Sequence, residues 1–383
     1  MDPILMLTQS LLIGFSIVGI VSAAPGTIVY HLATLAVAVA GTVLMSFFSP
    51  SWLVKQARWL FVVGLIILGF VLVYGVGPGS DQGARRWLIL ARLNDLTLTV
   101  QPSEFMKIVL VLYLASFFDR RGTDYPIIGP VLAIGLAAGM IAAETDFGTA
   151  IFILALALFI LVVIGVPLRR LLAIGLLVLL LAGSIHGIIQ HDRFKHIGIR
   201  ITAWKILNQS SPIGRWLHFD PDLLEKLKHS DPAYADLVSK ALYQPLTARM
   251  IMKAAGPFGH GPGASPPRKV PESDTDEIFT TITYATGWFG AAILILAYVL
   301  LFARGLQIAA RSSGAVSIVA LGLTGYLTGQ ALMNIVVTTA VVPVTGIALP
   351  MVSRGGSGLL AAGLAFGILH AISRKVLSQE VRR

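Results

Sequence analysis

The sequence predicts an all-α polytopic membrane protein, and its composition and its long apolar runs carry that prediction. Of the 383 residues, 56% are hydrophobic and 13% are charged, whereas soluble domains carry roughly 25% charged residues. The chain has no cysteine, which excludes a disulfide framework and any thiolate-based site. The net charge of +10 is typical of cytoplasmic loops that contact anionic membrane lipids, and we expect no nucleic-acid partner.

Ten segments approach the length of about 20 mainly apolar residues that a membrane-spanning helix needs. They are 4–24, 29–48, 55–75, 102–118, 126–143, 148–165, 169–189, 277–303, 314–342 and 357–373. The short helices on either side of residues 144–148 are also compatible with a re-entrant pair. We therefore divide the chain into helices one to seven (1–189), a large extracellular loop with amphipathic helices (190–276), and helices eight to ten with a cytoplasmic tail (277–383).

Lysine and arginine residues in the short loops predict the orientation, because such residues are concentrated on the cytoplasmic side. Alternate loops and the tail carry Lys55, Arg58, Arg120, Arg121, Arg169, Arg170, Arg304, Arg311, Arg374, Lys375, Arg382 and Arg383. All of them fall on one side if both termini are cytoplasmic. The loop with Arg85, Arg86 and Arg92 breaks this rule. The N-terminus lacks the basic region and the cleavage site of a signal peptide.

The insertion before the eighth helix contains three kinds of sequence. Residues 220–240 alternate in charge like a solvated helix. Residues 242–255 are amphipathic, with Arg249 and Lys253 on one face, as in a helix on a membrane surface. The glycine- and proline-rich run 256–263 predicts a turn that lets a ligand approach backbone N–H groups.

Polar residues also occur at predicted membrane depth. Glu104 and Lys107 lie three residues apart and can pair, either to fix helix packing or to serve a functional cavity. Glu144 and Asp146 flank a short outside turn, where ordinary solvation is the simpler interpretation. Asn334 lies in an apolar helix, and we expect it to form an interhelical hydrogen bond.

Residues 343–350, with two prolines, predict an irregular segment at the outer boundary. Non-helical backbone there must line a cavity or be covered by protein. The run Ser353–Ser357 then opens the last helix with a Gly-Gly-Ser sequence, whose free N–H groups suit an anion such as phosphate. A plain interfacial loop is the alternative.

The stretch Val270–Phe279 brings four acids, Glu272, Asp274, Asp276 and Glu277, to the start of an apolar helix. Carboxylates this close to a membrane are costly unless they are solvated, paired or used. The stretch is either a solvated loop in which Ser273, Asp274 or Asp276 caps the helix, or part of a site.

Seven motifs occur in one order along essentially the whole chain. They are Gly83–Trp87, Gln101–Glu104 with Lys107, Glu144–Thr149, Tyr243–Gln244, Gly256–Gly261, Pro271–Phe279 and Asn334–Ser357. This ordered set resembles the shape, elongation, division and sporulation family, which includes RodA, FtsW and SpoVE. The resemblance implies a ten-helix glycosyltransferase that polymerises the peptidoglycan precursor lipid II on the outer face of the cytoplasmic membrane. It also implies a class B penicillin-binding protein as partner, and it places the essential loop aspartate at Asp276.

The residues suit that chemistry. An acceptor sugar hydroxyl must lose a proton as it attacks, so a carboxylate such as Asp276 can act as general base. Direct attack inverts the anomeric carbon and needs no enzyme nucleophile. Cationic side chains, or a divalent cation such as Mg²⁺ or Mn²⁺, would stabilise the departing lipid pyrophosphate; the sequence identifies no metal ligands. Our candidate substrate-binding residues are Arg85, Arg86, Glu104, Lys107, Asp146, Arg193, Arg200, Lys269, Ser353 and Ser357, with Arg354 as a further cation.

The sequence departs from the family pattern at five positions near these motifs. Asp274 replaces a histidine, Glu277 a phenylalanine, Tyr284 and Ala285 a pair of glutamates, and Arg354 a tyrosine. These changes leave the subgroup open. Two other functions also stay open: a flippase or transporter for the lipid-linked precursor, and a non-catalytic scaffold for a penicillin-binding protein.

Overall fold

The computed structural model describes residues 1–77, 85–93, 96–122, 126–172, 175, 195–208, 232–268 and 270–380. In this part of the chain, seven helices are long and apolar enough to cross a membrane. They are α1 (Pro3–Ala23), α2 (Ile28–Phe47), α3 (Pro50–Tyr74), α6 (Phe147–Ile164), α11 (Ile278–Ala310), α12 (Gly314–Thr338) and α13 (Gly356–Glu380). The shorter apolar helix α5 (Ile128–Ala143) and the charged helix α4 (Pro102–Arg121) complete the bundle.

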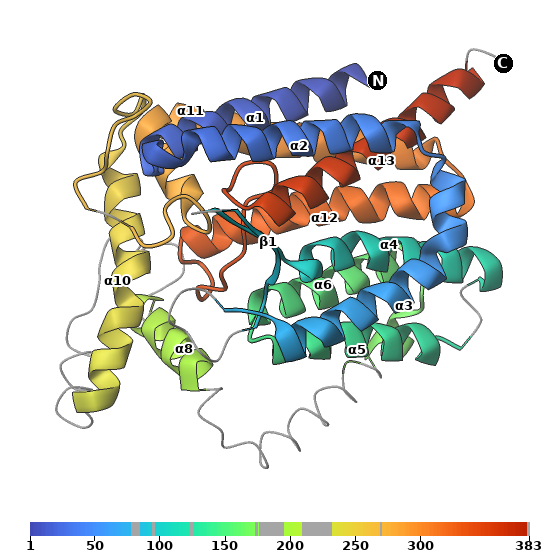
Figure 1. Ribbon diagram of the computed structural model, residues 1–383, viewed down its shortest axis with the longest axis horizontal. Helices are drawn as coiled ribbons and strands as arrows, with labels where there is room; N and C mark the ends of the chain where they lie inside the picture. The colour runs from blue at the N-terminus through green and yellow to red at the C-terminus, as the bar shows by residue number, and fades with distance from the viewer. Residues whose placement is uncertain are drawn as a thin grey trace.

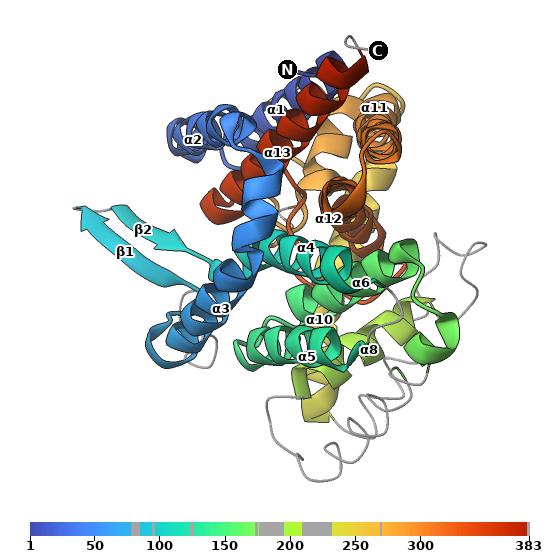
Figure 2. The same ribbon diagram turned by 90° about the vertical axis from the view of Figure 1, so that its right-hand side faces the viewer.

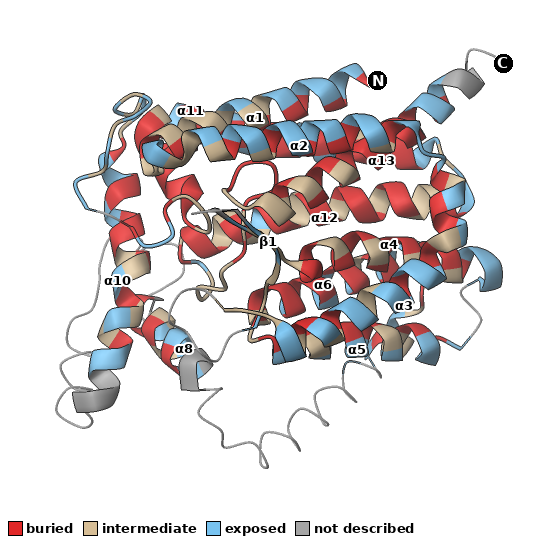
Figure 3. Cartoon of the chain, in the orientation of Figure 1, coloured by how far each residue is buried: buried red, intermediate tan, exposed pale blue. Residues whose placement is uncertain are grey.

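The long helices run side by side, and both termini lie at the same end of the bundle (Figure 1). Seen along the bundle, α1, α2, α11 and α13 form one side, α3 and α5 form the other, and α4, α6 and α12 lie between them (Figure 2). Helices α8 (Lys195–Asn208) and α10 (Pro232–Ala254) lie at the end away from the termini. Buried residues concentrate on α12 and on the inward faces of its neighbours, whereas α2 and α3 expose their outer faces (Figure 3).

The predicted mainly helical membrane fold is confirmed, with differences at the ends of elements. The predicted seventh helix, 169–189, lies largely outside the described residues. The predicted eighth helix runs further, to Ala310, and the predicted ninth ends earlier, at Thr338. A proline disfavours the helical conformation of the residue before it, and Pro343 follows soon after Thr338. The residues between them, and on to 350, form the irregular segment that was predicted.

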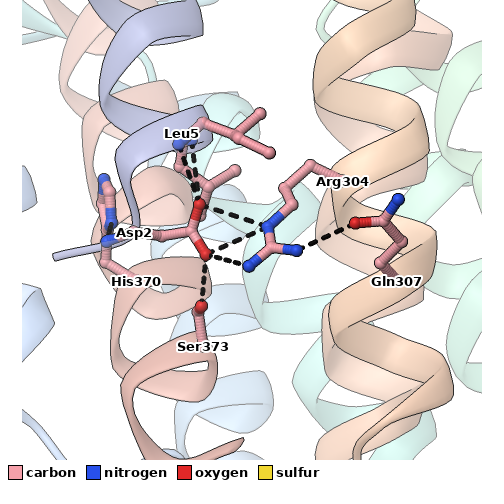
Figure 4. Close-up of polar contacts among 7 residues, drawn as sticks. Asp2, Leu5, Arg304, Gln307, His370 and Ser373 are labelled. Atoms are coloured by element: carbon pink, nitrogen blue, oxygen red, sulfur yellow. Dashed lines mark hydrogen bonds and ion pairs between the residues drawn. The ribbon is translucent and has the colours of Figure 1, made fainter. Parts of the chain in front are cut away.

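Helix α1 begins with a charged cluster at the terminal end of the bundle (Figure 4). The Asp2 carboxylate caps the helix by accepting from the backbone N–H groups of Ile4 and Leu5. The Arg304 guanidinium pairs with the same carboxylate at 2.6 Å, and the Ser373 hydroxyl donates to it at 2.5 Å. The cluster therefore joins α1, α11 and α13 at one point.

The backbone of the glycine- and proline-rich run 256–263 packs into a kink in α11. Gly287 has φ 72°, so the helix loses its regular hydrogen bonds there. The N–H groups of Trp288 and Phe289 donate instead to the carbonyls of Gly256 and Pro257, and Gly261 N–H donates to Ala285 O at 2.9 Å. The glycine-rich run thus uses its backbone on α11. The prediction that its N–H groups face a ligand is wrong for Gly261, and for His260, whose N–H donates to Tyr284 O at 3.0 Å.

Residues 88–93 and 96–100 form the two strands of a β-hairpin, which was not predicted. Strand β1 (Leu88–Leu93) pairs antiparallel with β2 (Leu96–Val100), and the hairpin projects from the bundle (Figure 2). The alternation Leu-Thr-Leu-Thr-Val in residues 96–100 is the period-two signal that could have indicated it.

Residues 232–254 of the insertion form one helix, α10, and it does not expose both Arg249 and Lys253. Lys253 is exposed, but Arg249 is buried. The Arg249 guanidinium donates to the carbonyls of Leu207 and Ala340. Arg249 therefore ties α8 and the end of α12 to α10, because packing against these elements covers the face that the sequence alone left open.

Candidate functional site

A cavity of about 2180 Å³ is lined in part by α8 and α10, the helices at the end of the bundle away from the termini. Parts of α6, α8, α10, α11, α12, the hairpin and the segment 342–348 line it. Along α12 the lining extends inward to Gly325, 13 residues from Thr338, which is about 20 Å of helix. Its charged lining residues are Arg86, Glu104, Asp146, Arg200, Lys240, Glu272, Asp276 and Arg354.

Asp276 is held through its backbone and presents its carboxylate to this cavity. Its carbonyl accepts from Asn334 Nδ2 at 2.8 Å and from Thr338 Oγ1 at 3.4 Å. No hydrogen bond or ion pair from a described residue reaches the carboxylate. A Cβ atom at position 346 would lie 3.3 Å from Asp276 Oδ2, so Gly346 leaves space beside it.

The electrostatic surroundings raise the pKa of Asp276 to about 7. Burial is the largest cause, because it penalises the charged form. The carboxylates of Glu272 and Asp146 raise the pKa further, and the guanidinium groups of Arg86 and Arg200 oppose them. A carboxyl group with this pKa can exchange a proton near neutral pH.

The loop that carries Asp276 is a sequence of tight turns fixed by neighbouring side chains. Glu272 has φ 55°, an uncommon conformation for a residue other than glycine. Its carbonyl accepts from the N–H groups of Thr275 and Glu277. The Thr281 hydroxyl donates to Ser273 O at 3.0 Å. The helix cap is Glu277, not Ser273, Asp274 or Asp276 as the sequence suggested.

Two arginines reach the cavity from different elements. Arg86, next to the hairpin, donates to Thr145 O at 2.7 Å. Arg200, on α8, donates to Val344 O at 3.2 Å. Both positive charges act to lower the pKa of Asp276. Both arginines line the same cavity as Asp276.

Glu104 and Lys107 form the predicted ion pair, with 2.7 Å between Lys107 Nζ and Glu104 Oε1. Lys107 is buried and also donates to Gln330 Oε1 at 2.8 Å, and Gln330 Nε2 donates to Ala348 O at 2.9 Å. Glu104 lines the cavity and Lys107 lies behind it. The pair therefore joins α4, α12 and the irregular segment, and it offers one member to the cavity.

Glu144 and Asp146 are buried, so the expectation of ordinary solvation is wrong. Asp146 caps α6 through Thr149 N–H and accepts from Gln101 Nε2 at 3.0 Å. The Glu144 carboxyl has no hydrogen-bond partner among the described residues, and burial, followed by the Asp146 charge, raises its pKa to about 8. Tertiary packing is close just after this turn: a Cβ at position 148 would lie 2.3 Å from Thr345 O, in the segment 342–348.

The remaining candidate residues are distributed unevenly. Ser357 lines the cavity at the start of α13 and accepts from Gln101 N–H at 2.8 Å. Arg85 lies outside the cavity lining, and its guanidinium donates to the carbonyls of Leu72 and Val73. Ser353 is buried, and its hydroxyl bonds Thr275 O at 2.6 Å. Arg193 and Lys269 lie outside the described residues.

Residues that depart from the family pattern form specific side-chain contacts in the structure. Arg354 and Asp274 form an ion pair with 2.7 Å between Nε and Oδ2. Glu277 is buried and accepts from Gln244 Nε2 at 3.0 Å and from Thr280 Oγ1 at 3.1 Å. Burial, as the largest cause, raises the pKa of Glu277 to about 8. The Tyr284 ring stacks on His260 with 4.1 Å between ring centroids.

Three residues of the site were missed or given another role at the sequence level. Asn334 bonds loop carbonyls, those of Asp276 and Ile347, and not a side chain of another helix. Gln330 had no predicted role. Tyr30 of α2 lines the same cavity as Thr97 and Thr99 of the hairpin, and no sequence signal connects α2 with the hairpin.

The sequence leaves open whether a divalent cation assists the departing pyrophosphate. Among the residues that the structure describes, no three histidine, aspartate or glutamate side chains come together closely enough to hold a metal ion.

The chain is similar to known proteins along nearly its whole length. Residues 4–377 match the family model described as "Cell cycle protein", which covers FtsW, RodA and SpoVE. The chain is 31% identical over 376 residues to a probable peptidoglycan glycosyltransferase FtsW of Alkalilimnicola ehrlichii, covering 94% of this chain and 84% of the relative. It is 27% identical over 327 residues to stage V sporulation protein E of Bacillus subtilis, covering 83% and 79%.

Solved structures agree with the fold. A chain from a structure of a peptidoglycan synthase complex, described as coordinating polymerization and crosslinking, matches with a TM-score of 0.71 and 26% identity over 98% of each chain. The crystal structure of the rod shape determining protein RodA of Thermus thermophilus matches with a TM-score of 0.66 and 22% identity, over 98% of this chain and 97% of that one. The chain is thus a mainly helical, multi-pass membrane protein that belongs to the FtsW, RodA and SpoVE family of cell cycle proteins.

Proposed function

We propose that this protein is a peptidoglycan glycosyltransferase that polymerises lipid II, with Asp276 as the general base. The observation that carries the proposal is the carboxylate of Asp276, which faces a large cavity without a partner among the described residues while two arginines lie close enough to influence it. Relatives named as probable peptidoglycan glycosyltransferases support it.

The proposed step moves one proton and exchanges one bond. The acceptor sugar hydroxyl attacks the anomeric carbon of the donor, and its proton passes to Asp276. A new C–O bond forms as the bond between the anomeric carbon and the phosphate oxygen breaks, and the lipid pyrophosphate leaves with the electron pair. Arg86 and Arg200 are the cations of the cavity that we assign to that departing charge.

The size and lining of the cavity suit two lipid-linked sugars. Its volume of about 2180 Å³ exceeds the roughly 300–1,000 Å³ of an ordinary ligand pocket. Its lining includes hydroxyl-bearing residues, Tyr30, Thr97 and Thr99, which suit a carbohydrate. Apolar residues of α6, α11 and α12, among them Phe159 and Leu332, also line it and suit a hydrocarbon chain.

We also propose that both termini are cytoplasmic and that the cavity faces outward, in a bacterial cytoplasmic membrane. The support is that Arg120, Arg304 and Arg374 lie in the C-terminal parts of α4, α11 and α13, and these helices end on the terminal side of the bundle (Figure 1). A class B penicillin-binding protein is the proposed partner. Its support is the likeness to a chain from a synthase complex in which polymerization and crosslinking are coordinated.

The test is incubation of the purified protein with lipid II, with and without its co-purified transpeptidase, followed by separation of glycan chains by size. We expect polymer from the wild type and none from Asp276→Asn. The control is Asp236→Asn, the same chemical change at an exposed side chain of α10, which should polymerise normally. Translocation of lipid II across vesicles without polymer would support a flippase, and neither activity would support a scaffold; each outcome would overturn the proposal.

A further inference from the structure

The loop that carries Asp276 is attached to a rigid neighbour at one charged contact. The guanidinium of Arg354 pairs with the Asp274 carboxylate at 2.7 Å, and the backbone N–H of Arg354 donates to Asp274 O at 2.8 Å. Asp274 is only two residues from Asp276. Side chain and backbone therefore both connect Arg354 to the loop.

The neighbour is rigid because the residues before Arg354 are buried and hydrogen-bonded to two helices, α1 and α11. Met351 and Val352 are fully buried. The Ser16 hydroxyl of α1 donates to Val352 O at 2.7 Å and contacts the ring of His31, on α2, at 2.7 Å. The Tyr298 hydroxyl of α11 donates to Pro350 O at 2.6 Å. Residues 350–354 thus form a platform, and the more exposed loop 272–276 rests on it.

The charge of Arg354 is directed to this contact. Its side chain is 35% exposed and borders the cavity, so it could in principle meet a ligand. However, its Nε faces Asp274, whose side chain is only 14% exposed. A carboxylate so close competes with any anionic ligand for the same guanidinium.

We propose that Arg354 and Asp274 are positioning residues, which hold the Asp276 carboxylate at its working place in the cavity, and that Arg354 does not bind the leaving group. This inference rests on the proposed function, because the position that matters is that of the general base. It also explains why the two charges occur together in one chain: either alone would be unpaired beside the cavity.

Single and double substitutions separate positioning from substrate binding. If the pair positions Asp276, Asp274→Asn and Arg354→Gln should each lower kcat by about 10- to 100-fold, with KM for lipid II within about twofold of the wild type. The kcat of the double variant should be no lower than that of the less active single variant, because the two residues act through one contact. If Arg354 instead binds the pyrophosphate, Asp274→Asn frees it, and unchanged or increased activity of that variant would overturn the proposal.

A covalent substitute for the ion pair gives a second test, and the chain is suited to it because it contains no cysteine. We would combine Asp274→Cys with Arg354→Cys. The backbone hydrogen bond of 2.8 Å from Arg354 N to Asp274 O brings the two residues next to each other, as a disulfide requires. The oxidised protein should regain at least half of the wild-type kcat, and reduction should remove it again.

The outcomes distinguish this inference from the proposed function. An oxidised, cross-linked double variant that stays as inactive as the reduced one would overturn the positioning role, and so would normal kcat in both single variants. Absence of polymer from the wild type, with efficient cross-linking in the variant, would instead overturn the proposed function and leave the contact established. The control Asp236→Asn should change neither kcat nor KM.

Discussion

Two aspartates, one at each end of the bundle, have opposite surroundings. Asp2, at the terminal end, is fully enclosed by donors: Arg304, Ser373 and the backbone N–H of Leu5 (Figure 4). Burial alone would raise its pKa, but these hydrogen bonds and the Arg304 charge lower the pKa to about 2. Asp276, at the cavity end, has no such donors among the described residues, and its pKa is raised to about 7.

The difference separates an acid used for structure from an acid available for chemistry. A carboxylate satisfied by several donors stays charged and stabilises the fold, because each donor favours the ionised form. A carboxyl group that is buried beside other acids, and only partly balanced by distant arginines, keeps its ability to take up a proton. Perturbed groups of this kind gather at functional sites.

The largest expected effect is the loss of activity on removing the Asp276 carboxylate, and it tests the comparison of Asp276 with Asp2 directly. Asp276→Asn should lower polymerisation by at least about 100-fold, because a positioned general base contributes roughly 10²–10⁴. Its thermal unfolding temperature in detergent should be unchanged or higher, since the substitution removes a partly buried carboxyl group that has no partner among the described residues. A large loss of stability in this variant would show that Asp276 is a structural acid like Asp2.

The pH dependence is the next largest effect. A general base must be ionised, so kcat/KM for lipid II should fall as the pH drops below about 7, the pKa of Asp276. Over pH 5.5–8 Asp2 stays ionised, because its pKa is about 2. A rate that is flat down to pH 5.5 would contradict the assignment. Thermal unfolding at each pH serves as the control for loss of folded protein.

Asp2→Asn should show the opposite pattern. The lowered folded-state pKa, about 2 against 3.8, corresponds to about 2 kcal/mol of stability. This contribution is present above pH 3.8 and is lost as the pH falls through about 2. We expect the variant to unfold at lower temperature while its kcat per folded molecule stays normal. The exposed control Asp236→Asn should change stability by less than about 0.5 kcal/mol.

The smallest expected effect tests the cause of the Asp276 shift. Glu272 is exposed at the cavity, and its carboxylate raises the pKa of Asp276. Glu272→Gln should therefore move the acid limb of the kcat/KM profile to lower pH, by less than about one unit, without reducing the rate at pH 8. A shift to higher pH would show that Glu272 acts in another way.

Individual residues show where sequence reasoning succeeded. Apolar runs placed the helices, since burial in lipid requires them locally. The spacing of Glu104 and Lys107 predicted their pairing, because three residues along a helix bring two side chains to one face. The charge cluster around Asp276 indicated a site, and the structure places that residue on the cavity wall.

Other features depended on residues far apart in the chain. Nothing local shows that Asp2 meets Arg304, 302 positions away, or that Thr345 packs against Gly148. Arg249 has the pattern of a surface residue, and it is buried because the ends of α8 and α12 pack over it. The hairpin is marked only by a short alternation of apolar and polar residues, which is a weaker signal than the long apolar runs of the helices.

The sequence by itself determined that this is a helical membrane protein of a recognisable family with an acidic loop before one helix. These properties follow from local hydrophobicity and from motif order. Only the tertiary structure decided which acids stay ionised and which can exchange a proton near neutral pH. That distinction depends on how many donors surround each carboxylate and how much water is excluded, and both are set by elements that meet only in the folded bundle.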